Sequence, residues 1–292
     1  MRLFYFDVTS NFGDALNPWL WPQLLGPRLA AEPDTLLVGI GTILNRRLPA
    51  ASAYRVFGSG CGYGPPPAIG AHWRFHAVRG PLTAQALGLA PDRAVTDAAY
   101  LLADVPLPAP RAGPPIGFMP HADAMPRIPW RRLAGQLGLR YIDPFAPVPE
   151  VLAAIRGCEC LVTEAMHGAI VADLCRVPWL PVATGGNVLA FKWRDWLGAM
   201  ELPYTPRHLA NLCRLTQHRP GENATAALLR RAANALWFSA QRLPLQRNLR
   251  TLLRDFHAHR APPCLSTDEV LRHRTDLLRL RLEELRRDLA AG

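Results

Sequence analysis

Short apolar runs alternate with amphipathic stretches along roughly the first 200 residues of the chain. Five of these runs have strand length: Arg2–Asp7, Leu36–Gly39, Arg55–Phe57, Phe75–Val78 and Ala94–Thr96. Asn11-Phe12-Gly13-Asp14 predicts a turn into a helix towards Leu25, and Pro81–Leu87 predicts a helix with Gly88 as its C-cap. This alternation favours an α/β fold with parallel strands.

A proline-rich segment interrupts the pattern at 105–115, where five of eleven residues are proline. Proline at this density excludes a helix or a central strand, so we predict a linker. A second alternating series follows, with strands at Ile116–Met119, Arg140–Asp143, Cys160–Thr163 and Trp179–Ala183, and helices at Pro129–Leu137, Pro149–Arg156 and Gly168–Cys175. We expect two Rossmann-like domains that face a cleft.

The pattern from about Pro206 onward is helical. Ser266-Thr267-Asp268-Glu269 has the spacing of a capping box and opens an arginine-rich helix to about Leu289, with leucines on one stripe. We expect this helix to pack on the protein, and the alternative is a basic helix on an anionic membrane. The expected domains are 1–104 and 116–205, joined by the linker 105–115 and followed by the helical tail 206–292.

The net charge of +10 favours anionic partners such as nucleic acid, acidic lipid or a phosphorylated substrate. Nucleic acid fits least, because the arginines are dispersed without a recognisable reading motif. No apolar run reaches the roughly 20 residues that span a bilayer. Since Asp7, Asn11 and Asp14 interrupt the start of the chain, we expect no signal peptide and a cytoplasmic protein. The six cysteines fit reduced thiols without a zinc pattern, and we predict no metal.

Lys192 is the only lysine among 33 basic residues. One interpretation is a solvated lysine whose neighbours, Phe191 and Trp193, belong to the core. However, lysine is a compact charge with an adjustable pKa, whereas arginine is a planar fork. A site that needs the compact charge would retain lysine, so we treat Lys192 as a candidate.

Other candidates lie where predicted strands end, the edge at which open α/β sheets bind ligands. Arg79 and His167 each stand before a predicted helix, and an arginine there can bind an anion while a histidine can move protons. The further candidates for substrate binding are Asn11, Gly13, Asp14, Gly41, Thr42, Gly58, Ser59, Gly60, Asp97, His121 and Glu164. For Asn11–Asp14 simple helix capping is the stronger interpretation, and tight turns explain the glycines almost as well.

Taken in order, these segments resemble the polysaccharide pyruvyl transferase family over roughly residues 1–200, and bacterial exopolysaccharide members most. The similar motifs are N-x-G-D at Asn11–Asp14, G-G-G-S/T at Gly39–Thr42, V-R-D/G-x-x-[ST] at Val78–Thr83, T-A/S-D at Thr96-Asp97, P-H-x-D at Pro120–Asp123 and S-x-R-x-H-G/A-x-I-x-A at Glu164–Ala172. This chain departs from the family at Ile40, Gly80, Glu164 and Met166; the arginine absent at 166 is one anion contact fewer.

The resemblance implies two Rossmann-like domains in a GT-B-like arrangement. It also implies phosphoenolpyruvate as co-substrate, without a further cofactor, and a saccharide acceptor that is lipid-linked. The family's arginine, histidine and lysine correspond to Arg79, His167 and Lys192. The expected product is a pyruvate ketal, with His167 as general acid and the two cations on carboxylate and phosphate.

Two other functions share some of these features. A GT-B glycosyltransferase has the same architecture but takes a nucleotide sugar as donor. A non-catalytic peripheral membrane protein could scaffold polysaccharide assembly at the inner face of the membrane through the helical tail. That protein would bind membrane without His167 and would release no phosphate from phosphoenolpyruvate.

Overall fold

The computed structural model describes residues 1–6, 11–30, 34–185, 189–212 and 223–291. Its first sheet contains β1 (Arg2–Phe4), β2 (Thr35–Val38), β3 (Ala53–Ser59) and β4 (Trp73–Val78), in that order. Every pairing is parallel. β2 is buried throughout and most residues of β3 and β4 are buried, as expected of parallel strands covered on both faces, whereas β1 at the edge is exposed or half-buried.

The second sheet is also parallel and has the strand order β6-β5-β7-β8-β9. Its strands are β5 (Ile116–Met119), β6 (Arg140–Tyr141), β7 (Cys160–Thr163), β8 (Trp179–Ala183) and β9 (Arg207–His208). Residues 105–115, all described, form neither helix nor strand and connect the two halves. The predicted α/β class with parallel strands is therefore confirmed, whereas the exact domain boundaries stay a prediction.

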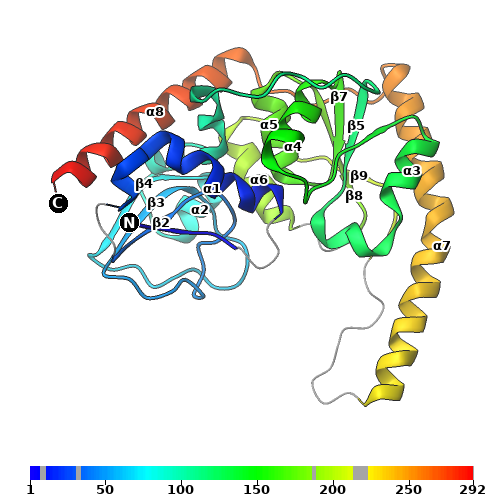
Figure 1. Cartoon of the computed structure of the whole chain (residues 1–292), viewed down its shortest axis with the longest axis horizontal. Coiled ribbons are helices and arrows are strands. Elements are labelled where there is room, and N and C mark those ends of the chain that lie inside the picture. The colour runs from blue at the N-terminus through cyan, green and yellow to red at the C-terminus, as the bar shows by residue number, and fades with distance from the viewer. Residues whose placement is uncertain (7–10, 31–33, 186–188, 213–222, 292) are drawn as a thin grey trace.

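Helices cover both sheets and also lie between them (Figure 1). The α-helices are α1 (Phe12–Leu25), α2 (Pro81–Ala86), α3 (Trp130–Gln136), α4 (Val148–Arg156), α5 (Met166–Leu174), α6 (Ala190–Ala199), α7 (Ala224–His257) and α8 (Asp268–Ala291). Short 3-10 helices are η1 (Gly26–Ala30), η2 (Pro91–Arg93), η3 (Ala98–Asp104) and η4 (Ala122–Arg127). Helix α1 contacts α4 and α5, and α2 contacts α6, so each half supplies helices to the other.

One hydrophobic cluster runs through both halves. It includes Trp21 and Tyr100 from the first half and Trp179, Trp193 and Trp196 from the second, all almost fully buried. The backbone N–H of Phe12 also donates to the carbonyl of Pro144 across the junction, at 2.7 Å. The ends of the two sheets are therefore held in a fixed relation.

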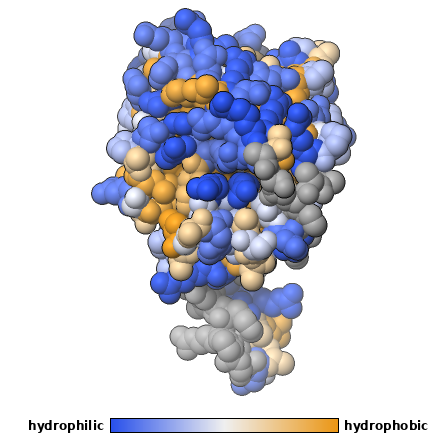
Figure 2. Space-filling view, turned by 90° about the vertical axis from the view of Figure 1, so that its left-hand side faces the viewer, coloured by the Kyte–Doolittle hydropathy of each residue, from blue (hydrophilic) through white to orange (hydrophobic). Residues whose placement is uncertain are grey.

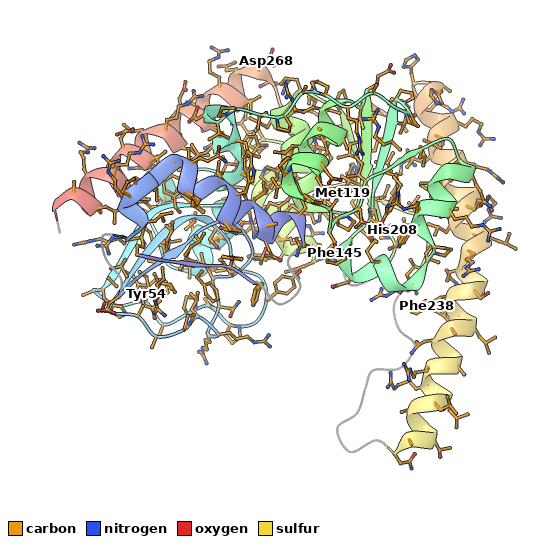
Figure 3. All side chains as sticks on the ribbon, viewed as in Figure 1. Tyr54, Met119, Phe145, His208, Phe238 and Asp268 are labelled. Atoms are coloured by element: carbon orange, nitrogen blue, oxygen red, sulfur yellow. The ribbon has the colours of Figure 1, made fainter. Side chains whose placement is uncertain are left out.

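The helical tail packs on both halves. Leu245, Leu249 and Leu252 of α7 are buried on the second half, and Phe238 lies on that side too (Figure 3). Helix α8 then crosses to the first half, where it contacts η3 and β4. Arg279 of α8 pairs with Asp104 at 2.6 Å. The prediction that the last helix packs on the protein is thus confirmed, and β9 shows that the tail is not wholly helical.

Most predicted elements are confirmed within two residues. The first strand ends at Phe4 rather than at Asp7, and residue 7 lies outside the described ranges. Ala94–Thr96 forms no strand; only an isolated bridge joins Ala94 to Val78. The segment after Tyr141 leaves the sheet sooner than predicted. Helix α6, which carries Lys192, was not predicted. It is buried on most sides, so its sequence lacks the separation of apolar and polar faces that indicates a helix. The five described cysteines are free thiols, as expected.

The face of the molecule that Figure 2 shows is largely hydrophilic, with apolar residues gathered in patches. In the described ranges no helix combines the length and apolar character needed to cross a membrane.

Candidate active site

The candidate residues gather at the carboxyl ends of the two parallel sheets, where the connections between strands and helices begin. On the first sheet, Thr42 follows β2, Ser59 ends β3 and Arg79 follows β4. On the second, His121 follows β5 and Glu164 follows β7. This edge is where open parallel sheets bind ligands.

His167 lies at the junction of the two halves. It belongs to the first turn of α5, and its Nε2 lies 3.5 Å from Oδ2 of Asp97, which caps η3 in the first half. Its ring covers Gly13 so closely that a β-carbon there would lie 2.1 Å from Nδ1. Within the described chain, Nε2 and Oδ2 are both buried and lack a hydrogen-bond partner. A small movement would therefore join them as a histidine–carboxylate pair.

Asn11 caps α1 beneath this histidine. Its Oδ1 accepts hydrogen bonds from the backbone N–H groups of Gly13 and Asp14, at 3.0 and 3.4 Å, and its Nδ2 donates to the Asp14 carboxylate. Burial raises the pKa of Asp14 to about 6, against the charges of His167 and Lys192, which lower it. The local geometry is that of the capping alternative, and Asp14 is an acid placed between two candidate cations.

Arg79 is fully buried. Its Nε donates to Oδ2 of Asp195 at 3.0 Å, one terminal nitrogen to Oγ1 of Thr42 at 2.7 Å, and the other to the carbonyl of Cys61 at 3.0 Å. Asp195 also accepts from the backbone N–H of Thr83. Three of the five N–H groups of the guanidinium are used in this way. Sequence reasoning missed Asp195, although a buried arginine requires an acidic partner.

The glycine-rich segments pack these elements together. The hydroxyl of Ser59 and the N–H of Gly60 both donate to the carbonyl of Gly41, at 3.0 and 2.9 Å. Gly58 has a φ of 70° and lies against Ala98, where a β-carbon would come within 2.3 Å of the backbone nitrogen. The tight-turn interpretation of these glycines therefore accounts for their contacts, and Gly58 also positions the η3 segment that contains Asp97.

Lys192 is buried, with 8% of its surface exposed, so the alternative of a solvated lysine is wrong. Its Nζ lies 3.4 Å from Nε2 of His121. Burial and then the charge of Arg79 lower the pKa of Lys192 to about 8, although nearby acids, Asp14 among them, oppose the shift. Burial and the charge of Lys192 lower the pKa of His121 to about 4. A desolvated lysine beside a neutral imidazole is suited to an anion.

Glu164 joins the ends of three strands. Its carboxylate accepts from the N–H and hydroxyl of Thr184 at 2.6 and 2.8 Å, and from the backbone N–H of His121 at 3.4 Å. Burial raises its pKa, and the bonds to Thr184 oppose that shift. Glu164 therefore holds the loops after β5 and β8, one of which carries His121.

The electrostatics bring the three predicted catalytic residues into one neighbourhood. The charges of His167 and Lys192 both act on Asp14, and the charge of Arg79 acts on Lys192. The three side chains come from α5, α6 and the end of β4. A histidine, a lysine and an arginine thus interact electrostatically, directly or through Asp14, which concentrates positive charge in a way that suits an anion.

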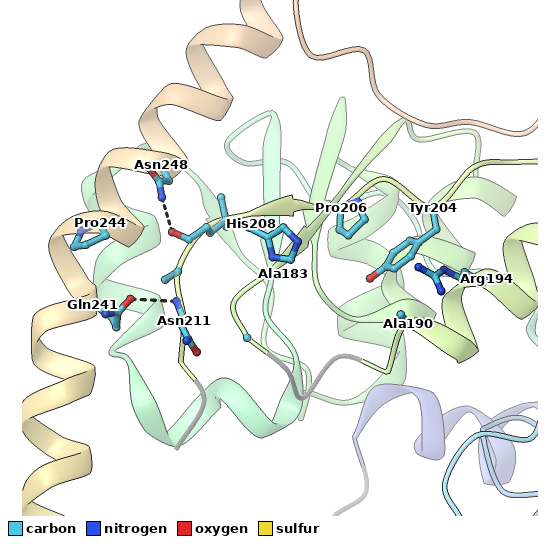
Figure 4. Close-up of a pocket in the computed structure, with 13 residues that line it drawn as sticks. Ala183, Ala190, Arg194, Tyr204, Pro206, His208, Asn211, Gln241, Pro244 and Asn248 are labelled. Carbon is cyan, nitrogen blue, oxygen red and sulfur yellow. Dashed lines mark hydrogen bonds between the residues drawn. The ribbon is translucent and has the colours of Figure 1, made fainter. Parts of the chain in front are cut away.

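A pocket of about 780 Å³ opens between the ends of β8 and β9 and the helix α7 (Figure 4). Its polar lining includes Arg194, His208, Gln241 and Asn248, and Tyr204 supplies an aromatic wall. None of the three predicted catalytic residues is part of its lining. Sequence reasoning missed it, because it forms where two segments distant in sequence meet.

No group of three or more His, Cys, Asp or Glu residues in the described ranges is arranged to bind a metal ion.

Comparison with known proteins shows which family this chain resembles. The family model described as polysaccharide pyruvyl transferase matches residues 71–186. The succinoglycan biosynthesis protein ExoV of Rhizobium meliloti (strain 1021) is 36% identical to this chain in an alignment of 314 positions, gaps included, that covers 99% of each chain. The matched region contains Arg79, Asp97, His121, Glu164 and His167, whereas Lys192 lies just beyond it.

Proposed function

Since this chain belongs to the polysaccharide pyruvyl transferase family, we propose that it transfers the pyruvyl group of phosphoenolpyruvate to two hydroxyls of a saccharide in exopolysaccharide biosynthesis. The proposed products are a pyruvate ketal and phosphate. The observation that carries the proposal is a histidine and a buried lysine whose charges both act on Asp14, together with a buried arginine whose charge acts on that lysine. Asp97, Asp195 and Glu164, which lie against His167, Arg79 and the His121 loop, take positioning roles.

Lys192 and Arg79 are the proposed binding groups for the donor. The phosphate and the carboxylate of the donor must both be desolvated on binding. Lys192, with a pKa of about 8, is largely protonated at neutral pH and is already desolvated. Its compact ammonium suits the departing phosphate. Arg79 contributes its charge and the N–H groups that Asp195, Thr42 and Cys61 do not use, which suit the carboxylate.

His167 is the proposed general acid. Asp97 lies beside its Nε2 and stabilises the imidazolium, which leaves Nδ1 to hold the proton that is transferred. Protonation of the donor's methylene carbon uses the electron pair of the alkene and leaves an oxocarbenium at C2. A general acid held against the alkene is therefore the central requirement of the reaction.

The remaining steps need two hydroxyls and one leaving group. The first hydroxyl adds to C2 and loses its proton. The C2–O bond to phosphate then breaks, and the second hydroxyl closes the ketal ring and loses its proton. Lys192 stabilises the departing phosphate. One proton is taken up at carbon and two are released from the hydroxyls: one of these restores the general acid, and the other leaves on the phosphate as HPO4²⁻. The reaction therefore requires no redox partner.

The pocket beside α7 is the proposed site for part of the acceptor. Saccharides are held by aromatic faces and by amide and charged side chains, and Tyr204, Gln241, Asn248 and Arg194 supply these groups. ExoV is named for succinoglycan biosynthesis. Oligosaccharides of the succinoglycan repeat are therefore the first acceptors to test, and we propose that the natural acceptor is lipid-linked.

We further propose that the two sheets are Rossmann-like domains in a GT-B-like arrangement and that the protein acts in the cytoplasm. Phosphoenolpyruvate enters as a co-substrate, and the proposed chemistry uses neither a metal nor a further cofactor. The fold and the co-substrate are proposed from the family likeness, and the location and the absence of a metal from the sequence patterns.

Isothermal titration calorimetry with phosphoenolpyruvate and with a panel of nucleotide sugars tests the choice of donor. We expect the unaltered protein to release heat on binding phosphoenolpyruvate. The variant Lys192→Gln should bind phosphoenolpyruvate with an affinity at least about tenfold lower. Leu280→Gln, at an exposed position of α8, serves as the control. Binding of a nucleotide sugar without binding of phosphoenolpyruvate would support the glycosyltransferase alternative instead.

A further inference from the structure

Helix α7 exposes a line of leucines that contributes nothing to the core. Leu228, Leu229, Leu236 and Leu243 are 66–76% exposed, the four most exposed of the large hydrophobic side chains in the described chain. The last three recur every seven residues, which places them in one line along the helix. Figure 1 shows this part of α7 extending beyond the second half. A contiguous apolar surface of this kind usually marks a contact.

The leucine line faces directly away from the protein. At 100° per residue it lies about 180° around the helix from Leu245, Leu249 and Leu252, which hold α7 on the second half. The same segment is anchored on its inner side, where Nε1 of Trp237 donates to the carbonyl of Asn211 at 2.9 Å. The leucines are therefore presented outward by a fixed helix.

The charge on α7 is of a single sign from its start to Arg254, and Asp255 follows in the last turn. Residues 224–254 contain six arginines and no acidic residue. Five of these arginines are exposed: Arg231, Arg242, Arg247, Arg250 and Arg254. The last three continue the leucine line, so the outer face is apolar in its first half and basic in its second. Such a face complements a surface that is both apolar and negatively charged.

Three partners could cover this face, and the charge distinguishes them. A second copy of the chain would bring its own Arg247, Arg250 and Arg254 to the same basic face. Nucleic acid would pair with the arginines but would leave the leucines in water. We propose that the outer face of α7 docks on an anionic phospholipid bilayer, with the leucines in the interfacial region and the arginines among the headgroups.

Helix α8 does not fit this role, although it is also rich in arginine. Its leucines at 278, 282, 285 and 289 are buried on the protein. Its arginines pair with acidic groups, as Arg281 does with Asp92 at 2.9 Å. Membrane contact, if it occurs through the helical tail, is therefore assigned to α7.

Docking through α7 would place the pocket near the bilayer, because Gln241, Pro244 and Asn248 of α7 line that pocket. This consequence rests on the proposed function, since it matters only for a lipid-linked acceptor. The docking itself does not, and vesicle binding needs neither phosphoenolpyruvate nor His167. The two proposals can therefore fail separately.

Flotation of the full-length protein with vesicles tests the inference. The probes are vesicles of phosphatidylcholine alone and of phosphatidylcholine mixed with phosphatidylglycerol. We expect binding to the mixed vesicles, weaker binding in high salt, and little binding to the neutral ones. The triple variant Leu229→Gln, Leu236→Gln, Leu243→Gln should bind at least about tenfold more weakly. Leu280→Gln on α8 is the matched control and should bind as the unaltered protein does.

A second variant tests the charge separately. Arg247→Gln with Arg250→Gln, both on the outer face, should weaken binding to the mixed vesicles by about fivefold for each arginine removed. Phosphate release with a soluble acceptor should stay unchanged in both variants. Equal binding to both kinds of vesicle, full binding by both variants, or a dimer that the triple variant abolishes would each overturn the inference. So would binding to nucleic acid in preference to the mixed vesicles.

Discussion

The Asp195 carboxylate and the Arg79 guanidinium form an ion pair at 3.0 Å that is completely buried at the junction of the two halves. Asp195 lies on α6, one turn after Lys192, and Arg79 follows β4. The pair therefore fixes the helix that carries Lys192 against the first sheet. Its geometry gives Arg79 a positioning role in addition to the proposed contact with the donor.

Removing one member of this pair should be more harmful than neutralising both. Arg79→Met leaves a buried carboxylate without its cation, and we expect it to lower the free energy of unfolding by about 3–5 kcal/mol. In the double variant with Asp195→Asn, an amide replaces the unpaired carboxylate and can still accept from Thr83. We expect urea denaturation to show the double variant to be more stable than Arg79→Met alone.

The exposed pair of Arg260 with Asp255 supplies the control for that experiment. Arg260→Met should cost less than about 1 kcal/mol, because the pair is solvated. Additive losses from Arg79→Met and Asp195→Asn would show that the two side chains do not act as a pair.

Lys192 should set the alkaline limit of activity. Its pKa of about 8 means that the ammonium is present below this pH and is lost as the pH rises through it. We expect kcat/KM for phosphoenolpyruvate to fall about tenfold per pH unit above pH 8. Lys192→Arg should be slower throughout, since the fork does not match the lysine's position, but should lack the decline because arginine stays charged. An unchanged alkaline limb in this variant would remove Lys192 from the assignment.

Asp14 should make stability depend on pH. The pKa of this carboxyl rises from 3.8 to about 6 on folding, so the folded protein binds the proton more tightly. The contribution of Asp14 to stability is therefore lost as the pH rises from about 4 to 6. Asp14→Asn should gain stability relative to the unaltered protein over this interval, by no more than about 3 kcal/mol.

The comparison between the two proteins is needed because His121 acts in the opposite direction. Burial lowers its pKa to about 4, so its contribution grows as the pH rises from 4 towards 6.5. Urea denaturation of both proteins at several pH values isolates the part due to Asp14. A difference between them that does not change with pH would show that Asp14 is not shifted.

A methyl group at Gly13 should impair activity more than stability. The β-carbon would lie 2.1 Å from Nδ1 of His167, so the imidazole must move. A displacement of about 1 Å in a catalytic group can cost on the order of 100-fold in rate. Gly135→Ala in α3, where the added carbon meets open space, is the control and should gain up to about 1 kcal/mol of helix stability. Equal rates of phosphate release in the two variants would contradict the position assigned to His167.

Local sequence pattern was sufficient to predict the strands and helices whose periodicity is strong. β5, β7 and β8 match their predicted bounds, because each is a short buried run between clear breaks. Ala94–Thr96 failed because apolar residues in a covered turn look like a strand when only the sequence is considered. Helix α6 was missed because buried aromatics surround it and its periodicity is weak.

The sequence was sufficient to identify candidate residues of the site, but not the contacts between them. Strand ends identified Arg79 and His167, and an arginine-rich composition identified Lys192. No pattern could show that Asp195 pairs with Arg79, because the two lie 116 residues apart and meet only in the folded chain. The same holds for the position of Asp97 beside His167 and for the pocket under α7.

The central claim is tested most directly by following one reaction with two signals, phosphate release and the methyl resonance of the pyruvate ketal on the saccharide. The reaction contains phosphoenolpyruvate and the oligosaccharide acceptors named above. We predict one phosphate for each ketal methyl group, and a loss of both signals by about 10²–10⁴-fold in folded His167→Ala. Ketal formation at the unaltered rate in that variant, or phosphate release without a ketal in the unaltered protein, would contradict it.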